Sequence, residues 1–203
     1  MEANRKPDDN KLFSLASQQA GYFTAEQAIA SGYSRQLVSH HALQGTFIRV
    51  RRGLYRLTKF PPSPYEEVIA AWLGFDPDKA VVSHETALQI FDLADVVPTT
   101  IHLTVPRSYR SRKAPPGVTV HTVLKPPRYN GVVVRNGVRV SAPARAIADA
   151  AAYGTAPEQI IRAAREALRR GLATRAELLA AARRHGGRPE KLIRQAVAEV
   201  RTG

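Results

Sequence analysis

Residues 33–57, YSRQLVSHHALQGTFIRVRRGLYRL, constrain the fold more strongly than any other stretch of the chain. Ser34 is a residue type that caps helix N-termini, and the apolar side chains after it recur at a helical spacing. Gly45 is suited to end that helix. Two alternating segments follow, and the Arg-Arg-Gly sequence between them suits a three-residue connection with its glycine in the left-handed conformation. The segment therefore predicts a helix that leads directly into a β-hairpin.

Two further helices are expected upstream of this segment. Asp8 to about Gln19 has apolar residues at a helical spacing, and Thr24 to Gln27 is a capping box that opens the second helix. Gly32 ends this second helix and lies in the short turn before the third. Three helices followed by a hairpin within about 60 residues are typical of a winged helix-turn-helix. We therefore predict a winged helix-turn-helix DNA-binding domain over residues 1–60.

The third helix is expected to present two different faces. At about 100° per residue, one arc is suited to face the core; it carries Leu37, Val38, His41 and Ala42. The opposite arc carries Arg35, Gln36, Ser39 and His40, joined by Leu43. These polar side chains are of types that reach base edges and phosphates, whereas a plain solvated face is the alternative. His41 is interpreted as a packed core histidine.

The side chains of the hairpin are expected to alternate between its two faces. Ile48 and Val50 face one side, Phe47 and Arg49 face the other, and Tyr55 and Leu57 continue the inward face. Arg49, Arg51 and Arg52, at the flank and the tip, suit contacts that straddle a phosphate backbone or enter a minor groove. The helix would then read the major groove of a duplex while the wing holds the adjacent backbone.

The charge of the chain also favours a polyanionic partner. Its 30 basic and 17 acidic side chains give a formal net charge of +13, and its pI is near 10.6. No acidic residue occurs between Val96 and Ala148, a stretch of 53 residues that contains nine basic side chains. A generally solvated basic surface is the alternative, but scattered charges would not clear acids from so long a stretch.

The sequence KFPPSP, residues 59–64, contains three prolines and is expected to separate two domains. Residues 61–203 are then predicted to form an α+β domain with a small antiparallel sheet and C-terminal helices. Strands are expected at 100–106 and 118–124, and a hairpin at 132–140 with a type I′ turn at Asn136-Gly137. Helices are expected at 65–75, after Ser83, from Pro143 to Ala152, after the capping boxes Thr155–Glu158 and Thr174–Glu177, and from Pro189 to about Val200.

Six basic residues of the acid-free stretch are expected in two loops of this second domain. They are Arg107, Arg110, Arg112, Lys113, Lys125 and Arg128. The first four follow the strand at 100–106, and the last two follow the strand at 118–124. If both loops lie at the same end of the sheet, they form one positive surface that suits a polyanion, whereas solvated loops are the alternative.

No catalytic or metal-binding constellation is expected. The chain has no cysteine, which excludes disulfides and thiolate metal sites. His102 and His121 both lie on expected strands and are placed to pair across the sheet, but the acid-free stretch supplies no carboxylate to complete a metal site. Ser83, His84 and Glu85 are helix neighbours that point in different directions and form no catalytic relay, so Ser83 is interpreted as a helix cap. We therefore expect no cofactor, no metal and no enzymatic activity.

Several stretches resemble those of one bacterial protein family. They are Gly53-Leu54-Tyr55 after the hairpin arginines, SHETALQIFDLADVVPTTIHLTVPR at 83–107 and SAPARAIADAA at 141–151. In this order and spacing, over about residues 10–200, the chain resembles the AbiEi antitoxins of bacterial AbiE-type toxin–antitoxin systems.

The resemblance implies an autorepressor that binds inverted repeats in its own promoter through the winged helix-turn-helix. It also implies that the second domain counteracts a nucleotidyltransferase-like toxin, and that no stable complex between the two proteins is required. Because no heptad helix is evident, we expect a monomer that occupies inverted repeats as pairs. No apolar run suits a signal peptide or a membrane span, so the protein is expected in the cytoplasm.

Other functions are alternatives at this stage. The chain would also suit a stand-alone winged-helix transcriptional regulator. An enzyme that cleaves nucleic acid or modifies the toxin has less support, because the acids after residue 148 lie in helical contexts without the acidic-x-Lys strand of a metal-dependent nuclease. An RNA-binding protein would need aromatic stacking platforms, and the acid-free stretch contains only Tyr109 and Tyr129.

Overall fold

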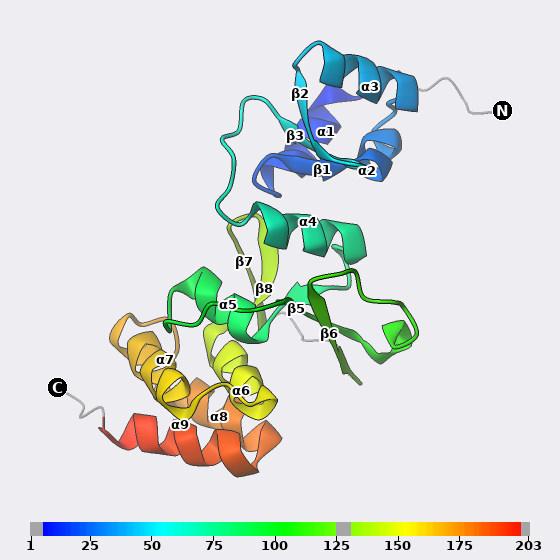
Figure 1. The fold of residues 1–203 in the computed structure, drawn as a ribbon. Coiled ribbons are helices and arrows are strands. Elements are labelled where there is room, and N and C mark those ends of the chain that lie inside the picture. The colour runs from blue at the N-terminus through cyan, green and yellow to red at the C-terminus, as the bar shows by residue number, and fades with distance from the viewer. Residues whose placement is uncertain (1–5, 125–130, 200–203) are drawn as a thin grey trace. The chain divides into compact units, whose positions relative to one another are not determined.

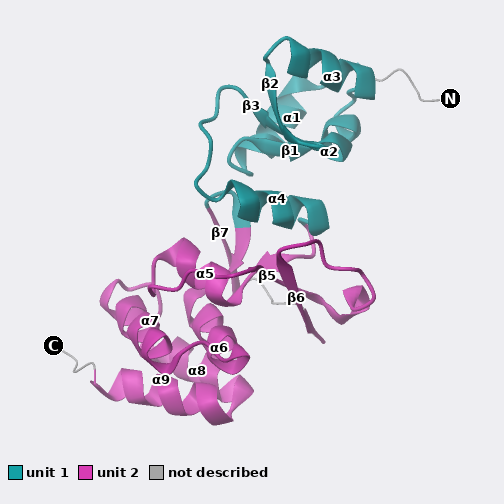
Figure 2. Ribbon diagram, in the orientation of Figure 1, with its two compact units in different colours: residues 1–77, 136–138 teal, residues 78–135, 139–203 magenta. Residues whose placement is uncertain are grey.

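The computed structural model describes residues 6–124 and 131–199 (Figure 1). The chain divides into two compact units, which Figure 2 shows in separate colours. Unit 1 comprises residues 1–77 and 136–138, and unit 2 comprises residues 78–135 and 139–203. The segment with three prolines lies within unit 1, and a functional domain boundary at residue 60 stays a prediction.

Unit 1 is a winged helix-turn-helix with one additional helix. Its elements are α1 (Asp9–Ser17), β1 (Tyr22–Thr24), α2 (Ala25–Ala30), α3 (Arg35–Leu43), β2 (Phe47–Arg51), β3 (Leu54–Leu57) and α4 (Glu66–Phe75). The three strands form an antiparallel sheet in the order β1-β3-β2. The expected three helices and wing are therefore confirmed.

The helices of the winged helix-turn-helix begin where the sequence predicts. The side chains of Asp8 and Ser34 each accept a hydrogen bond from the backbone amide three residues on, at 2.9 and 3.1 Å. Thr24 and Gln27 form the predicted capping box at the start of α2. These are local interactions between near neighbours in the sequence, which is why residue type alone predicts them.

The core of unit 1 lies between its three N-terminal helices and one face of the sheet. Its buried residues are Leu12, Ala16, Phe23, Ala28, Tyr33, Val38, Phe47 and Tyr55. The inward face of β2 is that of Phe47, whereas Ile48 is 36% exposed. Because Phe47 pairs with Leu57 in the antiparallel register, Leu57 shares this inward face.

The tip of the hairpin is tighter than expected. Arg51 still pairs with Leu54, so the connection consists of Arg52 and Gly53 alone. Gly53 adopts a φ of +76°, as predicted for a glycine in the left-handed region. A register shift between Arg49 and Arg51 accompanies this turn, so the strand is irregular where the wing arginines lie.

Unit 2 is an α+β unit. Its elements are β4 (Val81–Val82), α5 (His84–Phe91), β5 (Ile101–Pro106), the short 3₁₀ helix η1 (Arg107–Tyr109), β6 (Val118–Val123), β7 (Val132–Arg135), β8 (Val138–Ser141, whose first residue belongs to unit 1), α6 (Pro143–Tyr153), α7 (Pro157–Arg169), α8 (Arg175–His185) and α9 (Gly187–Glu199). The sheet has the order β6-β5-β4-β8-β7 and is mixed: β4 pairs antiparallel with β5, whereas β5–β6 and β4–β8 are parallel. The α+β class predicted from the sequence is confirmed, whereas the sheet of this unit is mixed and not the antiparallel sheet expected.

Turn and cap chemistry in the rest of the chain agrees with the sequence in part. Asn136 and Gly137 have φ values of +51° and +77°, as a type I′ turn requires, and the capping box that starts at Thr174 is present. The predicted cap at Thr155 is wrong, because Ala156 is the N-cap of α7. The Thr155 hydroxyl instead donates a hydrogen bond of 2.8 Å to Glu85.

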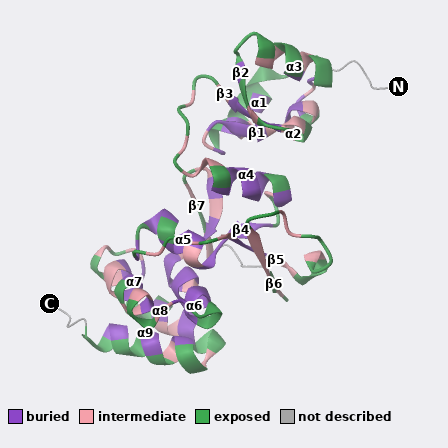
Figure 3. Cartoon of the chain, in the orientation of Figure 1, coloured by how far each residue is buried: buried purple, intermediate pink, exposed green. Residues whose placement is uncertain are grey.

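Burial follows the packing of the elements (Figure 3). Val68, Ile69 and Trp72 on α4 are buried, and this helix packs against β1 within unit 1. In unit 2, α6 packs against α8, and Asp149 on α6 is 5% exposed. Among the described residues, no helix is both long enough and apolar enough to cross a membrane.

Candidate nucleic-acid interface

The turn between α2 and α3 fixes the direction in which α3 leaves the core. Gly32 in this turn has a φ of +90°, and a Cβ there would lie 2.7 Å from the carbonyl oxygen of Lys6. The hydroxyl of the next residue, Tyr33, donates a hydrogen bond of 2.6 Å to Asp9 on α1. Burial of Tyr33 and its bond to Asp9 raise the pKa of the phenol well above its ordinary value. The turn is thereby held against α1.

The inner face of α3 packs as the sequence predicts. Val38 is 2% exposed, and Leu37 and Ala42 pack against the same core. The His41 ring lies 4.8 Å from the ring of Phe47 and 5.7 Å from that of Tyr33, measured between ring centroids. His41 is therefore a packing residue, as expected.

The outer face of α3 is exposed to solvent. It carries the four residues expected to contact nucleic acid, Arg35, Gln36, Ser39 and His40, all of which are exposed. Leu43 at the end of the helix is 86% exposed, which is unusual for a leucine next to a packed hairpin. A short connection joins α3 to β2, and the two elements pack against each other. The wing therefore lies next to α3.

The wing arginines are exposed as well, but they differ in their surroundings. Arg49 and Arg52 are exposed, whereas Arg51 also forms an ion pair of 3.6 Å with Glu67 on α4. Arg56 on β3 is instead buried, with its guanidinium hydrogen-bonded to the carbonyl of Phe60. Sequence reasoning missed the ion pair, because only the folded position of α4 brings Glu67 to the wing.

A family comparison covers this part of the chain. Residues 10–58 match a family described as transcriptional regulator, AbiEi antitoxin. We refer to this matched stretch, residues 10–58, as the AbiEi segment. The match runs from α1 to just past β3 and so includes the helix-turn-helix and the wing. The resemblance to AbiEi antitoxins is confirmed over this range.

Two further comparisons add no functional information. The crystal structure of the RV2827C protein from Mycobacterium tuberculosis aligns over 99% of this chain and 85% of that chain, with 14% identity and a TM-score of 0.46. A TM-score at this level supports no conclusion. No curated protein sequence matches the chain significantly.

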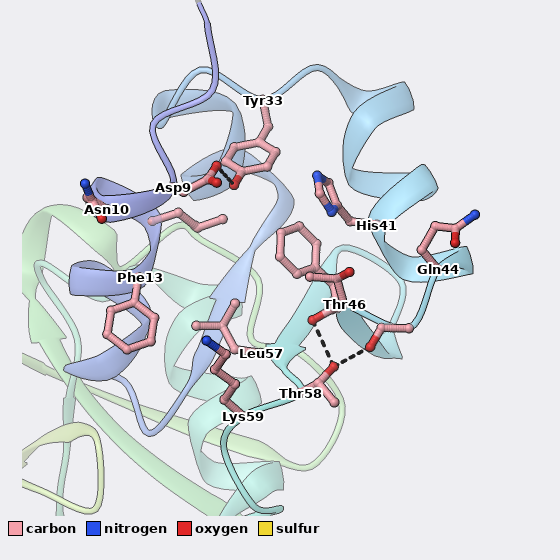
Figure 4. A pocket seen from close by; sticks show the side chains of 13 residues that line it. Asp9, Asn10, Phe13, Tyr33, His41, Gln44, Thr46, Leu57, Thr58 and Lys59 are labelled. Carbon is pink, nitrogen blue, oxygen red and sulfur yellow. Dashed lines mark hydrogen bonds between the residues drawn. The ribbon is translucent and has the colours of Figure 1, made fainter.

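The AbiEi segment and its neighbours Asp9 and Lys59 line a pocket of about 670 Å³ (Figure 4). Its wall runs from α1, through Asp9 and Phe13, to His41 at the inner face of α3. Figure 4 shows the Thr58 hydroxyl bridging the carbonyls of Gly45 and Thr46, which lie between α3 and β2. These bonds tie the connection between α3 and β2 to the residue that follows β3.

Outside the AbiEi segment, the structure places the basic residues of unit 2 in part. Arg107, Arg110, Arg112 and Lys113 are exposed, in η1 and the loop after it. Lys125 and Arg128 lie outside the described residues. β5 and β6 are parallel, with Pro106 paired to Val123, so the two strands finish at the same end of the sheet. One positive surface shared with Lys125 and Arg128 stays a prediction.

Unit 2 also brings together histidines that lie far apart in the sequence. The expected pairing of His102 with His121 is confirmed, with a hydrogen bond of 2.9 Å between their rings. Ser83 makes no side-chain cap, because its hydroxyl is hydrogen-bonded to His84 Nδ1 at 2.9 Å. Glu85 lies near His102, which supplies the carboxylate that the acid-free stretch lacks. The spacing of the histidines in the sequence contained no signal for this cluster.

Proposed function

We propose that this chain is an antitoxin that represses its own operon by binding inverted-repeat promoter DNA and that counteracts a nucleotidyltransferase-like toxin. The observation that carries the DNA-binding part is the exposed polar face of α3, which leads into an arginine-bearing wing within the AbiEi segment. Regulators with this fold place the second helix of the helix-turn-helix in the major groove.

The outer face of α3 suits direct readout of bases. Arg35 and Gln36 lie in the first turn of the helix, the part of a recognition helix that meets base edges. Arginine forms paired hydrogen bonds with guanine, and glutamine forms them with adenine. Leu43, exposed at the other end of α3, suits contact with a thymine methyl group.

The wing suits contacts that do not depend on sequence. Arg49, Arg51 and Arg52 are exposed on β2 and the turn after it, and guanidinium groups bind phosphates or enter a narrow minor groove. Such contacts strengthen binding to every duplex and make it salt-dependent, while α3 supplies the preference for one sequence.

For unit 2, we propose that the basic loop from Arg107 to Lys113 contacts a polyanion. This is either DNA that flanks the operator or the nucleic acid on which the toxin acts. Its support is the exposure of the four basic side chains and the common end of the sheet at which β5 and β6 finish. A stand-alone regulator or an enzyme that modifies the toxin remains the alternative function.

A mobility-shift experiment with the full chain tests this function. The probes are the intergenic DNA upstream of the gene, a scrambled duplex of the same length, and RNA of the operator sequence, all at one salt concentration. We expect preferential retardation of the upstream duplex. Toxin rescue in cells is measured in parallel with the neighbouring toxin gene. Equal binding of all three probes, or an absence of rescue, would overturn the corresponding half of the proposal.

A further inference from the structure

Three histidines from three different elements of unit 2 meet at one place. His84 begins α5, His102 lies on β5 and His121 lies on β6. One ring nitrogen from each lies within 4.8 Å of the others. His102 pairs in register with Thr119, two residues before His121, so both strand histidines project from the same face of the sheet.

Contacts with Ser83 and Glu85 engage one ring nitrogen of His84 and one of His102. His84 Nδ1 is bonded to the Ser83 hydroxyl at 2.9 Å, and that hydroxyl accepts a bond of 2.8 Å from Thr104. His102 Nε2 lies 3.9 Å from the Glu85 carboxylate. The nitrogens not used in these contacts are His84 Nε2, His102 Nδ1 and either nitrogen of His121.

Glu85 has the position of an outer carboxylate in a metal site. Histidines that bind a metal through one nitrogen usually direct the other N–H to a carboxylate, carbonyl or water. Here Glu85 faces His102 Nε2, and its other oxygen accepts a hydrogen bond of 2.8 Å from the Thr155 hydroxyl. The carboxylate is thus held by Thr155, just before α7, at 3.9 Å from the His102 ring nitrogen, which is longer than a hydrogen bond.

The backbone of the cluster agrees with such a role. His84 is a buried residue with a φ of +52°, a left-handed conformation that non-glycine residues adopt rarely and mostly where function or packing imposes it.

The separation of the strand histidines is close to that in a metal site. His102 Nδ1 and His121 Nε2 are 2.9 Å apart, whereas two ligands of a tetrahedral Zn²⁺ with bonds of about 2.0–2.1 Å are roughly 3.3 Å apart. An ion would replace the proton now shared by these nitrogens. The His84 ring stacks on that of His121 at 3.6 Å and 16°, so it must turn to present its lone pair.

We propose that His84, His102 and His121 form a binding site for one divalent transition-metal ion, with Zn²⁺ the best-fitting species. Imidazole nitrogens suit Zn²⁺, and three of them leave a fourth position for water. Tyr153, whose exposed ring lies edge-on to all three histidines, covers the outer side of the cluster. The ion would tie α5, β5 and β6 together and stabilise unit 2.

Metal binding by the full chain tests this site directly and does not depend on DNA binding. The chain is stripped with a chelator and titrated with Zn²⁺ by calorimetry and with Co²⁺ by visible absorption. We expect one ion per chain, the absorption bands of tetrahedral Co²⁺ and a higher Tm with Zn²⁺. A folded wild-type chain that binds neither ion, or binds both without a rise in Tm, overturns the proposal.

Variants assign the ion to these residues. His121→Gln and His102→Gln are compared with His40→Gln, which removes an exposed histidine on α3. Mutation of a residue that only supports a metal ligand typically lowers metal affinity by roughly 10–100-fold. We expect His121→Gln and His102→Gln to lower Zn²⁺ affinity by more than this, and His40→Gln to leave it unchanged. His121 is only half-buried, so His121→Gln stays informative if His102→Gln unfolds. A folded His121→Gln chain with wild-type affinity contradicts the assignment.

Discussion

Arg51 is shared between the proposed DNA surface and an acidic neighbour, Glu67, at 3.6 Å. Both side chains are largely exposed, so the pair itself contributes little to folding. Glu67→Gln is expected to release Arg51 and to tighten binding to every duplex by about two- to threefold, as the loss of an exposed pair worth under 1 kcal/mol allows. Fluorescence anisotropy with operator and scrambled DNA measures this.

The control for Glu67→Gln is Glu158→Gln on α7, which removes the same charge from an exposed position without touching Arg51. An equal gain in affinity for the two variants would show that net charge, not release of the wing arginine, causes the effect.

Gln36 is expected to read bases from the first turn of α3. Gln36→Ala should weaken operator binding by about 1–3 kcal/mol and leave binding to scrambled DNA nearly unchanged, because glutamine contributes to direct readout. Gln18→Ala, at an exposed position after α1, serves as the control. Equal losses on both DNA sequences would mean that this face of α3 contacts only phosphates.

For single residues, the sequence predicts which side chains are exposed but not which side chains of other elements they contact. The outer face of α3 follows from helical periodicity, which is a local property. The pairing of Arg51 with Glu67, and of His102 with Glu85, depends on where separate elements pack. No spacing in the sequence encodes those contacts.

The wing is the element expected to supply sequence-independent affinity. The triple alanine variant of Arg49, Arg51 and Arg52 should weaken binding to all duplexes. The slope of log K against log salt should flatten by about 0.9 for each phosphate that the wing no longer neutralises. Affinity measured from low to high salt gives this slope, and a slope equal to that of the wild type would contradict the wing assignment.

Helix starts show why some elements are predictable and others are not. The caps at Ser34, Thr24 and Thr174 form between residues three apart, so the sequence alone predicts them. Thr155 and Ser83 are equally suited to capping by residue type. The Thr155 hydroxyl instead donates a hydrogen bond to Glu85 on α5. The Ser83 hydroxyl is hydrogen-bonded to the ring of its neighbour His84 and accepts a hydrogen bond from Thr104 on β5. At both positions a contact with another element therefore outweighs the local propensity to cap a helix.

For the molecule as a whole, the basic loop in unit 2 has two possible roles, which alanine substitutions distinguish. The full chain with alanines at Arg107, Arg110, Arg112 and Lys113 should bind the operator more weakly and with a flatter salt slope if the loop extends the DNA footprint. If the loop serves antitoxicity, operator binding should be unchanged while toxin rescue in cells is abolished. Unchanged operator affinity together with unchanged toxin rescue would show that these residues form an ordinary solvated loop.

The α+β class, the winged helix-turn-helix and the hairpin at Asn136-Gly137 follow from local patterns and agree with the structure. The parallel pairing of β5 with β6 does not, because strand direction depends on the path of the loop between them. That pairing brings His102 to His121 and makes both strands finish at one end of the sheet. The features of unit 2 that suggest function thus arise from topology.

A footprint of the full chain on the DNA upstream of its gene tests the central claim most directly. We expect two protected half-sites that form an inverted repeat, with centres about one helical turn of 10 bp, or a multiple of it, apart. Protection should disappear from both half-sites with the wing triple variant. Uniform protection without half-sites, or none at concentrations that retard scrambled DNA equally, would contradict the proposal that α3 and the wing recognise an operator.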